Sequence, residues 1–266
     1  MQVMLAKDIE DVKSRSYVGW YASEKLDGMR CYWDGMGATG EKVKGRLVTG
    51  FYSRYGNVIS VPKRWVEEAP KGVKLDGELW CGMENRQKLL ATTKDYYPSK
   101  DWDDVEFHVF ESPGSGKLFK DTYQYLLSLS LSLPPFIKVI EQTILESSEH
   151  QGMLLKAIIA QGGEGLMLRN PYSYYQNTRS SDLVKVKNKL MGRATVIGFT
   201  RGKGKYSGMI GALTVMWNNV VFDISGMVDS ERVIGSFNDG DKVMFQYCGL
   251  STNGVPQEAR YKGRAE

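Results

Sequence analysis

Cysteine and histidine are scarce in this chain of 266 residues, which has three cysteines and two histidines. Cys31, Cys81 and Cys248 lie far apart and form no Cys-x-x-Cys pair, which argues against a disulfide framework and against a zinc site. We therefore expect a reducing, cytoplasmic environment. Chemistry that needs a histidine pair or a Ser-His-Asp triad is disfavoured, and His108 and His150 are expected to be packing or surface residues.

The chain also lacks an apolar run long enough to span a membrane and a basic-then-apolar start typical of a signal peptide. We therefore expect no membrane association. Its composition, with 42% hydrophobic and 25% charged residues, is that of an ordinary folded protein, which excludes global disorder. A chain of this length can bury one large core or two modest ones.

The net charge of +4 is too small to indicate nucleic-acid binding by itself, but the basic residues are unevenly distributed. Between positions 179 and 205, eight basic residues stand against one acidic residue, Asp182. A basic segment is usually a solvated surface, yet one so unbalanced in a nearly neutral protein predicts a track for a polyanion. The eight are Arg179, Lys185, Lys187, Lys189, Arg193, Arg201, Lys203 and Lys205.

The sequence Ser-Glu-Lys-Leu-Asp-Gly-Met-Arg, which contains Lys25, lies between two expected strands, 17–22 and 31–33. Asp27 and the glycine after it predict the turn of a hairpin. A lysine kept from water at the end of a strand loses its charge readily and becomes a usable amine nucleophile. Asp27 would share its face and could hold the amine, and Arg30 adds a guanidinium suited to phosphate. The alternative is a hairpin whose charges merely face solvent.

Two further segments carry carboxylates that could serve a ligand. Residues 73–80 alternate apolar and polar, so Asp76 and Glu78 share one face of a half-buried strand. Such a pair suits a ribose hydroxyl pair or a hydrated metal, or simply forms a polar outer face. Glu164 stands between glycines, where burial without a partner is costly and a hard divalent cation would be a natural partner.

Taken in order, these segments resemble the motifs of the covalent nucleotidyltransferases: ATP-dependent DNA ligases, RNA ligases and mRNA capping enzymes. Lys-x-Asp-Gly-x-Arg at 25–30 resembles the nucleotidyl-acceptor motif. With Trp20 and Glu24 ahead of it, the segment looks most like the small ATP-dependent DNA ligases of bacteria and phages. The resemblance implies that Lys25 is the catalytic nucleophile and that Glu24, Asp27 and Arg30 help to bind the nucleotide.

Other segments match further ligase motifs. Asp-Gly-Glu-Leu resembles the third motif, whose Glu, here Glu78, contacts the nucleotide sugar. Phe110 resembles the Phe that stacks on adenine, although this chain has Glu111 where the ligases usually have Asp. Glu-Gly-x-Met-Leu-Arg resembles the fourth motif, and the resemblance implies that Glu164 serves the metal.

The phosphate and DNA contacts come from the remaining matches. Lys185 and Lys187 would share one face of a strand and repel each other unless an anion lies nearby, and the strand resembles the fifth motif, which meets the α-phosphate. Arg54 in Ser-Arg-x-Gly resembles the ligase Arg that touches the phosphate at a nick. Lys203 and Lys205 lie on an expected loop that could grip a DNA backbone, as well as being plausible exposed turn residues.

The end of the chain resembles the ending of the minimal bacterial ligases. Those ligases usually carry Arg-Phe-Pro where this chain has Gln-Glu-Ala at 257–259. The basic character of the ending is kept, and the resemblance implies that Arg260 or Arg264 orients the pyrophosphate in the first step.

The resemblance runs from about Met4 to Arg264 and implies an α+β fold in two domains. Residues 1–189 would form an ATP-grasp-like nucleotidyltransferase domain of antiparallel sheets with flanking helices. Residues 190–266, with short strands and turn signals, would form a small OB-fold β-barrel, although periodicity alone leaves a small sandwich open. We expect helices at 63–69, 84–93, 122–133, 147–161 and 229–237, and strands at 58–61 and 136–145, although the Leu-Ser alternation at 127–133 also fits a strand.

The sequence therefore predicts an enzyme, a minimal ATP-dependent DNA ligase that uses ATP and Mg²⁺ and acts as a monomer on nicked double-stranded DNA in replication, repair or recombination. Lys25 would attack the α-phosphorus of ATP, AMP would pass to a 5′-phosphate, and a 3′-hydroxyl would displace AMP. Only 24 residues precede Lys25, fewer than the extra domain of NAD⁺-dependent ligases needs. An RNA ligase or RNA-capping guanylyltransferase, and a catalytically inactive OB-type nucleic-acid-binding protein, stay open as alternatives.

Overall fold

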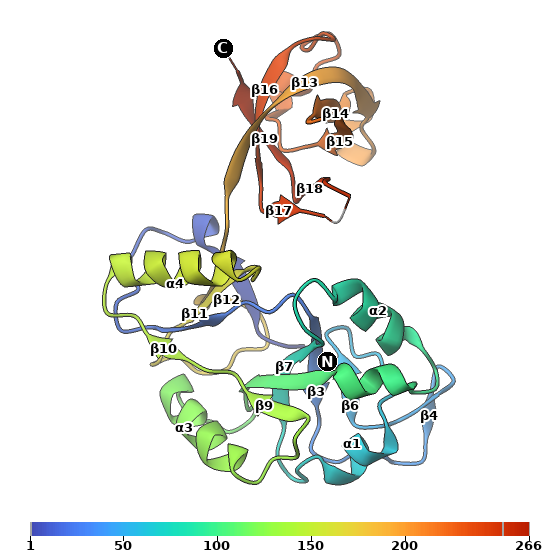
Figure 1. Cartoon of the computed structure of the whole chain (residues 1–266), viewed down its shortest axis with the longest axis vertical. Helices are drawn as coiled ribbons and strands as arrows, with labels where there is room; N and C mark the ends of the chain where they lie inside the picture. The colour runs from blue at the N-terminus through green and yellow to red at the C-terminus, as the bar shows by residue number, and fades with distance from the viewer. Residues whose placement is uncertain (1, 252, 266) are drawn as a thin grey trace. The chain divides into compact units, whose positions relative to one another are not determined.

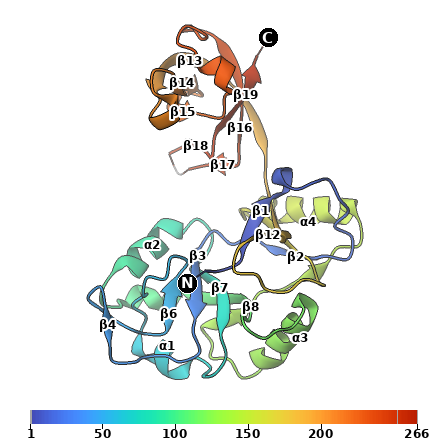
Figure 2. The ribbon, with the colours of Figure 1, turned by 180° about the vertical axis from the view of Figure 1, so that it is seen from behind.

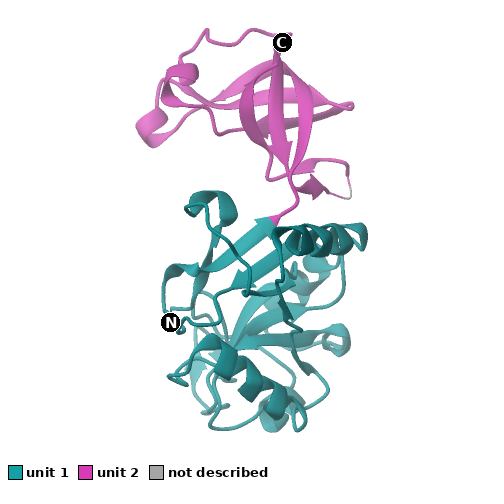
Figure 3. Ribbon diagram, turned by 90° about the vertical axis from the view of Figure 1, so that its left-hand side faces the viewer, with its two compact units in different colours: residues 1–186 teal, residues 187–266 magenta. Residues whose placement is uncertain are grey.

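The computed structural model describes residues 2–251 and 253–265. The chain divides into two compact units, residues 1–186 and 187–266 (Figure 3). In the described part, none of the helices has the length and apolar character needed to cross a membrane.

Unit 1 is built on two five-stranded sheets (Figure 1). The first has the order β1 (Leu5–Asp8), β12 (Arg179–Lys187), β11 (Gly165–Arg169), β2 (Tyr21–Glu24) and β10 (Thr143–Ile144). The second has the order β6 (Phe51–Ser53), β3 (Met29–Trp33), β7 (Leu75–Trp80), β8 (Glu106–Glu111) and β9 (Ile137–Val139). The expected α+β class is confirmed, but β1 pairs with β12, and β8 with β9, in parallel rather than antiparallel register.

Helices cover both sheets. They are α1 (Lys63–Glu68), α2 (Arg86–Lys94), α3 (Phe119–Ser130) and α4 (Ser148–Ala160). α2 packs on β3 and β7, α3 on β8 and β9, and α4 on β11, and the view from behind shows α4 beside β12 and β2 of the same sheet (Figure 2). Short 3₁₀ turns occur at η1 (Ile9–Asp11) and η2 (Lys100–Asp104), and a two-stranded hairpin pairs β4 (Lys42–Val43) with β5 (Arg46–Leu47).

The prediction of helices in unit 1 is confirmed, including the ambiguous Leu-Ser segment, which is helical to Ser130 in α3. The buried side chains of α3 are Phe119, Thr122, Tyr123 and Leu126, which recur at the spacing of one helix face. The alternation at 127–133 therefore reflects an exposed helix end and the turn after it, because Leu127 and Leu131 face solvent.

Three strand predictions in unit 1 are wrong, for related reasons. Residues 58–61 form no strand, and only a single bridge joins Val58 to Tyr52. The expected strand 136–145 is broken into β9 and β10, which belong to different sheets. The expected hairpin around Lys25 is also absent, because β2 belongs to the first sheet and β3 to the second. The periodicity of apolar residues predicts that a strand is buried, but it does not predict the sheet in which the strand pairs.

Unit 2 is an antiparallel five-stranded sheet with the order β15 (Val220–Ile224), β14 (Ile210–Trp217), β13 (Leu190–Arg201), β16 (Lys242–Tyr247) and β19 (Arg260–Arg264). Its edges meet at one bridge, where Tyr261 N–H donates to the Ser225 carbonyl over 2.8 Å. In the described residues the edges share this single bridge and no ladder, so the sheet does not close into the continuous barrel that we expected. Smaller elements are η3 (Gly204–Tyr206), η4 (Asp229–Arg232), β17 (Gly249–Leu250) and β18 (Pro256–Gln257).

The expected helix at 229–237 is reduced to the 3₁₀ turn η4, which ends at Arg232. Gly235 has φ of 96°, a left-handed conformation that ends helical winding, so the segment continues as turns.

Ser147 forms the N-terminal cap of α4. The Ser147 hydroxyl oxygen accepts a hydrogen bond from His150 N–H at 3.0 Å, which satisfies one of the free donors at the helix start. Ser147→Ala should lower the free energy of unfolding by about 1 kcal/mol in a urea titration. The neighbouring Ser148→Ala, at an exposed position inside the helix, is the matched control and should have little effect; equal effects of the two substitutions would contradict the cap.

Candidate active site

Lys25 lies where the chain leaves the first sheet for the second, directly after β2. Its backbone N–H donates to the Gly165 carbonyl of β11 over 2.8 Å, which fixes this point of the chain on the first sheet. Its ammonium is paired with the Glu164 carboxylate, and the two side chains are 22% and 21% exposed. The lysine predicted as nucleophile and the glutamate predicted to serve a metal are therefore in direct contact.

Gly28 brings the segment after Lys25 against β7. A Cβ at this position would lie 2.1 Å from the Leu79 carbonyl oxygen and 2.8 Å from Glu78 Cγ, so a side chain would prevent the approach. Burial raises the pKa of Glu78 to about 7, although the charges of Arg30 and Lys25 oppose this shift. Glu78 therefore belongs to the same charged cluster as Lys25.

Arg30 is held by Asp76 on the neighbouring strand β7. Its Nε and Nη2 donate to the two carboxylate oxygens of Asp76, each over 2.6 Å, and Nη2 also donates to the Met4 carbonyl at 3.1 Å. Its guanidinium carbon lies 4.6 Å from the centre of the Phe110 ring. Asp76 is fully buried, so the expectation that Asp76 and Glu78 together face a ligand is corrected: Asp76 binds Arg30 and only Glu78 lies beside Lys25.

Phe110 lies on the partly exposed face of β8, opposite the core residues Phe107 and Val109. The next residue, Glu111, is buried and accepts a hydrogen bond from Arg169 Nη2 at 3.1 Å. Burial raises the pKa of Glu111, and Arg169 opposes the shift. Glu111 therefore ties β8 of the second sheet to β11 of the first.

Glu24 and Asp27 lie on either side of Lys25. The Glu24 carboxylate lies against the turn before β11, because a Cβ at Gly163 would be 2.9 Å from its Oε1, and burial raises the pKa of Glu24. Asp27 forms an ion pair with Arg86 of α2 at 3.0 Å. The carboxylate that the structure places on the Lys25 amine is that of Glu164.

Both lysines of β12 have a carboxylate partner. Lys185 Nζ lies 3.9 Å from Asp8 Oδ2 across the parallel β1–β12 pair. Lys187, where unit 2 begins, is paired with Glu258, and its side chain is only 8% exposed. Glu258 has φ of 52°, a left-handed conformation that is uncommon for a residue with a side chain.

The predicted DNA-contact residues are exposed. Arg54 follows β6, with its guanidinium carbon 5.5 Å from the centre of the Tyr55 ring. Lys203 precedes η3, and Lys205 within it lies 4.5 Å from the centre of the Tyr206 ring. These positions leave their side chains accessible to a partner in solution.

The two arginines of β19 differ. Arg264 Nη1 lies 3.3 Å from Asp241 Oδ2, and its guanidinium carbon is 4.3 Å from the centre of the Phe237 ring. Arg260 is exposed at the start of the strand. Arg264 is therefore held within unit 2 by an ion pair and an aromatic ring.

Sequence reasoning missed Tyr175 altogether. Its hydroxyl donates to Asp76 Oδ2 at 2.5 Å and accepts a hydrogen bond from the Met4 N–H at 3.0 Å. Tyr175 stands in the loop between β11 and β12 beside Tyr172 and Tyr174, and nothing in the spacing of these tyrosines distinguishes it. Only the folded structure brings it to Asp76.

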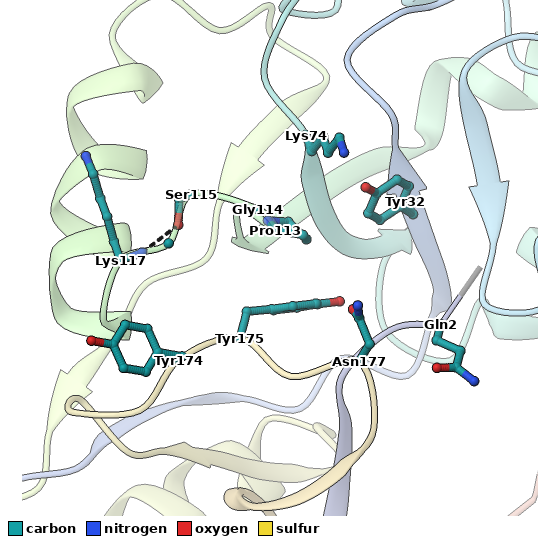
Figure 4. Close-up of a pocket in the computed structure, with 11 residues that line it drawn as sticks. Gln2, Tyr32, Lys74, Pro113, Gly114, Ser115, Lys117, Tyr174, Tyr175 and Asn177 are labelled. Atoms are coloured by element: carbon teal, nitrogen blue, oxygen red, sulfur yellow. Dashed lines mark hydrogen bonds between the residues drawn. The ribbon is translucent and has the colours of Figure 1, made fainter.

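The Tyr175 side chain also lines a cavity of about 520 Å³ (Figure 4). The loop residues Tyr174, Tyr175 and Asn177 face Lys74, Tyr32 and Pro113 across it. None of the residues predicted for the site lines this cavity. The cavity is therefore distinct from the cluster around Lys25. The described part of the chain also contains no group of three or more His, Cys, Asp or Glu side chains suited to hold a metal ion.

Comparison with protein families shows similarity over most of the chain. The model of the ATP dependent DNA ligase domain matches residues 3–187, and that of the DNA ligase OB-like domain matches residues 201–264. A DNA ligase of Haemophilus influenzae (strain ATCC 51907 / DSM 11121 / KW20 / Rd) is 29% identical over 244 residues, which are 91% of this chain and 85% of that protein.

Solved structures of DNA ligases are also similar to this chain. A structure described as "DNA binding with a minimal scaffold: Structure-function analysis of Lig E DNA ligases" has a TM-score of 0.85 and 30% identity, covering 100% of this chain and 99% of that chain. The DNA ligase–adenylate of Chlorella virus shares the fold at a TM-score of 0.54 and 20% identity, covering 100% of this chain and 98% of that one.

The raised pKa of Glu78 predicts a pH-dependent stability. Its usual pKa is 4.5 and its pKa in the fold is about 7, so between these values the unfolded chain has lost the proton that the folded protein keeps. Stability therefore falls as pH rises through this window. From about pH 5 to about pH 8, urea unfolding should show the wild-type protein losing on the order of 1 to 3 kcal/mol more than Glu78→Gln.

The control for this titration is Glu68→Gln, at an exposed position of α1. It should reproduce the wild-type pH dependence. If Glu78→Gln also reproduces that dependence, the carboxyl group of Glu78 is not the one that titrates near neutrality.

Proposed function

Since the chain belongs to the ATP-dependent DNA ligases, we propose that Lys25 takes AMP from ATP and that the enzyme then joins the ends at a nick in double-stranded DNA. The chain is thus an enzyme that uses ATP. The observation that best supports the assignment of Lys25 is its position at the crossing between two sheets, paired with Glu164 and beside Glu78. Roles in DNA repair, replication and recombination are typical of the family.

In the first step the Lys25 amine attacks the α-phosphorus of ATP. An N–P bond forms, the bond to the bridging oxygen breaks, and pyrophosphate leaves. The amine is nucleophilic only after its ammonium has lost a proton, and Glu164 is a carboxylate in direct contact that can accept one. Reactions of this kind depend mainly on positioning and on neutralising charge.

The nucleoside has three candidate contacts on the second sheet and one on the first. Phe110 offers a partly exposed ring on which the adenine can stack, and Glu78 is placed to accept from a ribose hydroxyl. Arg30 contacts Phe110 and thereby contributes to this surface. Glu24, from the opposite sheet, completes the set beside Lys25.

The phosphates require positive charge. Lys185 and Lys187 of β12 would supply it once each exchanges its present carboxylate for a phosphate oxygen. Mg²⁺ commonly uses one or two protein carboxylates together with phosphates and water, so the single carboxylate of Glu164 fits such an ion. When bound, Mg²⁺ would neutralise charge on the α-phosphate.

The later steps use the same nucleotide site with DNA in place of pyrophosphate. The 5′-phosphate takes AMP from Lys25, and the 3′-hydroxyl then displaces AMP and closes the strand. We assign Arg54, Lys203 and Lys205 to the DNA backbone, because they are exposed cations. Of the two C-terminal arginines, exposed Arg260 fits the orientation of pyrophosphate better than Arg264, which is already engaged. We further propose that the enzyme acts as a monomer.

The alternative functions, an RNA ligase or guanylyltransferase and an inactive OB-type binding protein, are not favoured. The matched family models describe DNA ligases, and all four of Lys25, Glu78, Glu164 and Lys187 are present in the sequence. An RNA ligase or guanylyltransferase would prefer RNA ends or GTP, and an inactive OB-type binding protein would take no label from ATP.

Lys25→Ala should abolish transfer of label from α-labelled ATP to the protein, since no amine remains at the acceptor position. Intact-mass measurement of the wild-type protein with ATP and Mg²⁺ should show the gain of one adenylate. Lys13→Ala, an exposed lysine, is the control and should label normally. Label retained by Lys25→Ala on another residue would refute the assignment.

Lys185→Ala and Lys187→Ala should each slow nucleotidylation by on the order of ten- to thousandfold, as expected for lost stabilisation of transition-state charge. Single-turnover labelling with α-labelled ATP measures this rate. Lys63→Ala, an exposed lysine of α1, serves as the control. Rates near the wild-type value in both β12 variants would remove these lysines from the site.

Glu258 and a phosphate oxygen compete for Lys187 in this scheme, so the Lys187–Glu258 pair must open before ATP reacts. Glu258→Gln removes the negative charge and should raise the single-turnover nucleotidylation rate at subsaturating ATP about two- to tenfold. Asp239→Asn, an exposed acid of the same unit, controls for the general change in charge. A slower or unchanged rate in Glu258→Gln would show that this pair does not restrain Lys187.

A further inference from the structure

A single hydrogen-bonded network joins the two sheets of unit 1 behind Phe110. Asp76 on β7 receives Arg30 of β3 through two bonds of 2.6 Å. Tyr175, from the loop between β11 and β12, donates to Asp76 over 2.5 Å, and the backbone of Met4 closes the network from the N-terminal segment. Because Tyr175 comes from the loop between two strands of the first sheet and Asp76 from a strand of the second, this network links the two sheets.

The network ends on the aromatic ring proposed to carry the adenine. Arg30 holds its guanidinium 4.6 Å from the centre of the Phe110 ring, within the range of a cation–π contact. The position of that guanidinium follows from Asp76, which binds two of its nitrogen atoms. Asp76 is fully buried, so its carboxylate takes its orientation from its protein partners, Arg30 and Tyr175.

We propose that Tyr175 is a positioning residue for the nucleotide: its hydroxyl orients Asp76, Asp76 orients Arg30, and Arg30 sets the ring of Phe110 on which the base stacks. This inference rests on the proposed function of Phe110. Burial raises the pKa of Tyr175, so the hydroxyl keeps its proton and remains a donor at neutral pH.

The surroundings of Tyr175 allow its hydroxyl to be tested alone. The ring lines the cavity of Figure 4, and the hydroxyl reaches Asp76. Tyr175→Phe keeps the ring on the cavity wall and removes only the two hydrogen bonds. Tyr174→Phe is a matched control, because Tyr174 belongs to the same loop and lining but is 57% exposed.

The experiment measures kcat and the KM for ATP in multiple-turnover sealing of nicked double-stranded DNA. Tyr175→Phe should raise KM for ATP about tenfold while kcat stays within about twofold of the wild-type value, since ground-state and transition-state binding of the base weaken alike. Tyr174→Phe should leave both constants unchanged. A thermal midpoint close to that of the wild type shows that the variant is folded, and a KM equal to that of Tyr174→Phe would overturn the proposal.

A double-variant cycle with Phe110→Leu separates positioning from general support of the fold. If Tyr175 acts through the Phe110 ring, removing its hydroxyl after the ring is gone should add little, and the double variant should match Phe110→Leu. Effects on KM that multiply fully would show that Tyr175 acts independently of Phe110, and the proposal fails. Failure of the proposed function is distinct, because the wild-type protein itself would then take no label from ATP on Lys25.

Discussion

The ion pair between Lys25 and Glu164 is the interaction around which unit 1 is arranged. Each side chain is only about one-fifth exposed, and a charge so shielded needs an opposite charge in contact. Lys25 directly follows β2 and Glu164 precedes β11, its partner strand, so antiparallel pairing of these strands brings the two groups together.

Buried ion pairs also join the two sheets. Arg169 of β11 binds Glu111 of β8, and the Tyr175 hydroxyl donates to Asp76, which is paired with Arg30. Removal of one partner from such a pair leaves an uncompensated buried charge, which typically costs about 3 to 5 kcal/mol. Charged contacts therefore connect the two sheets, and the candidate nucleotide surface at Phe110 lies against one of them.

Several parts of the fold follow from local patterns. The Ser147 cap, the alternation of β8 and the helical spacing of Phe119, Thr122 and Leu126 each rest on contacts within a few residues. Local patterns predict the segments 17–33 and 136–145 wrongly, because each segment crosses from one sheet to the other. A periodic pattern describes which side chains are buried, while the choice of partner strand depends on residues more than a hundred positions away, such as Gly165 for Lys25.

The sequence by itself determined the order and chemistry of the ligase motifs, because Lys25, Glu78 and Glu164 are identified by their immediate neighbours. It also determined the α+β character and the strand-rich second unit. Only the tertiary structure decided that Glu164 is the carboxylate on the Lys25 amine, that Asp76 is taken by Arg30, and that Tyr175 completes the network. These contacts join segments separated by 46 to 139 residues, and such pairings arise from strand order and packing, which no local pattern encodes.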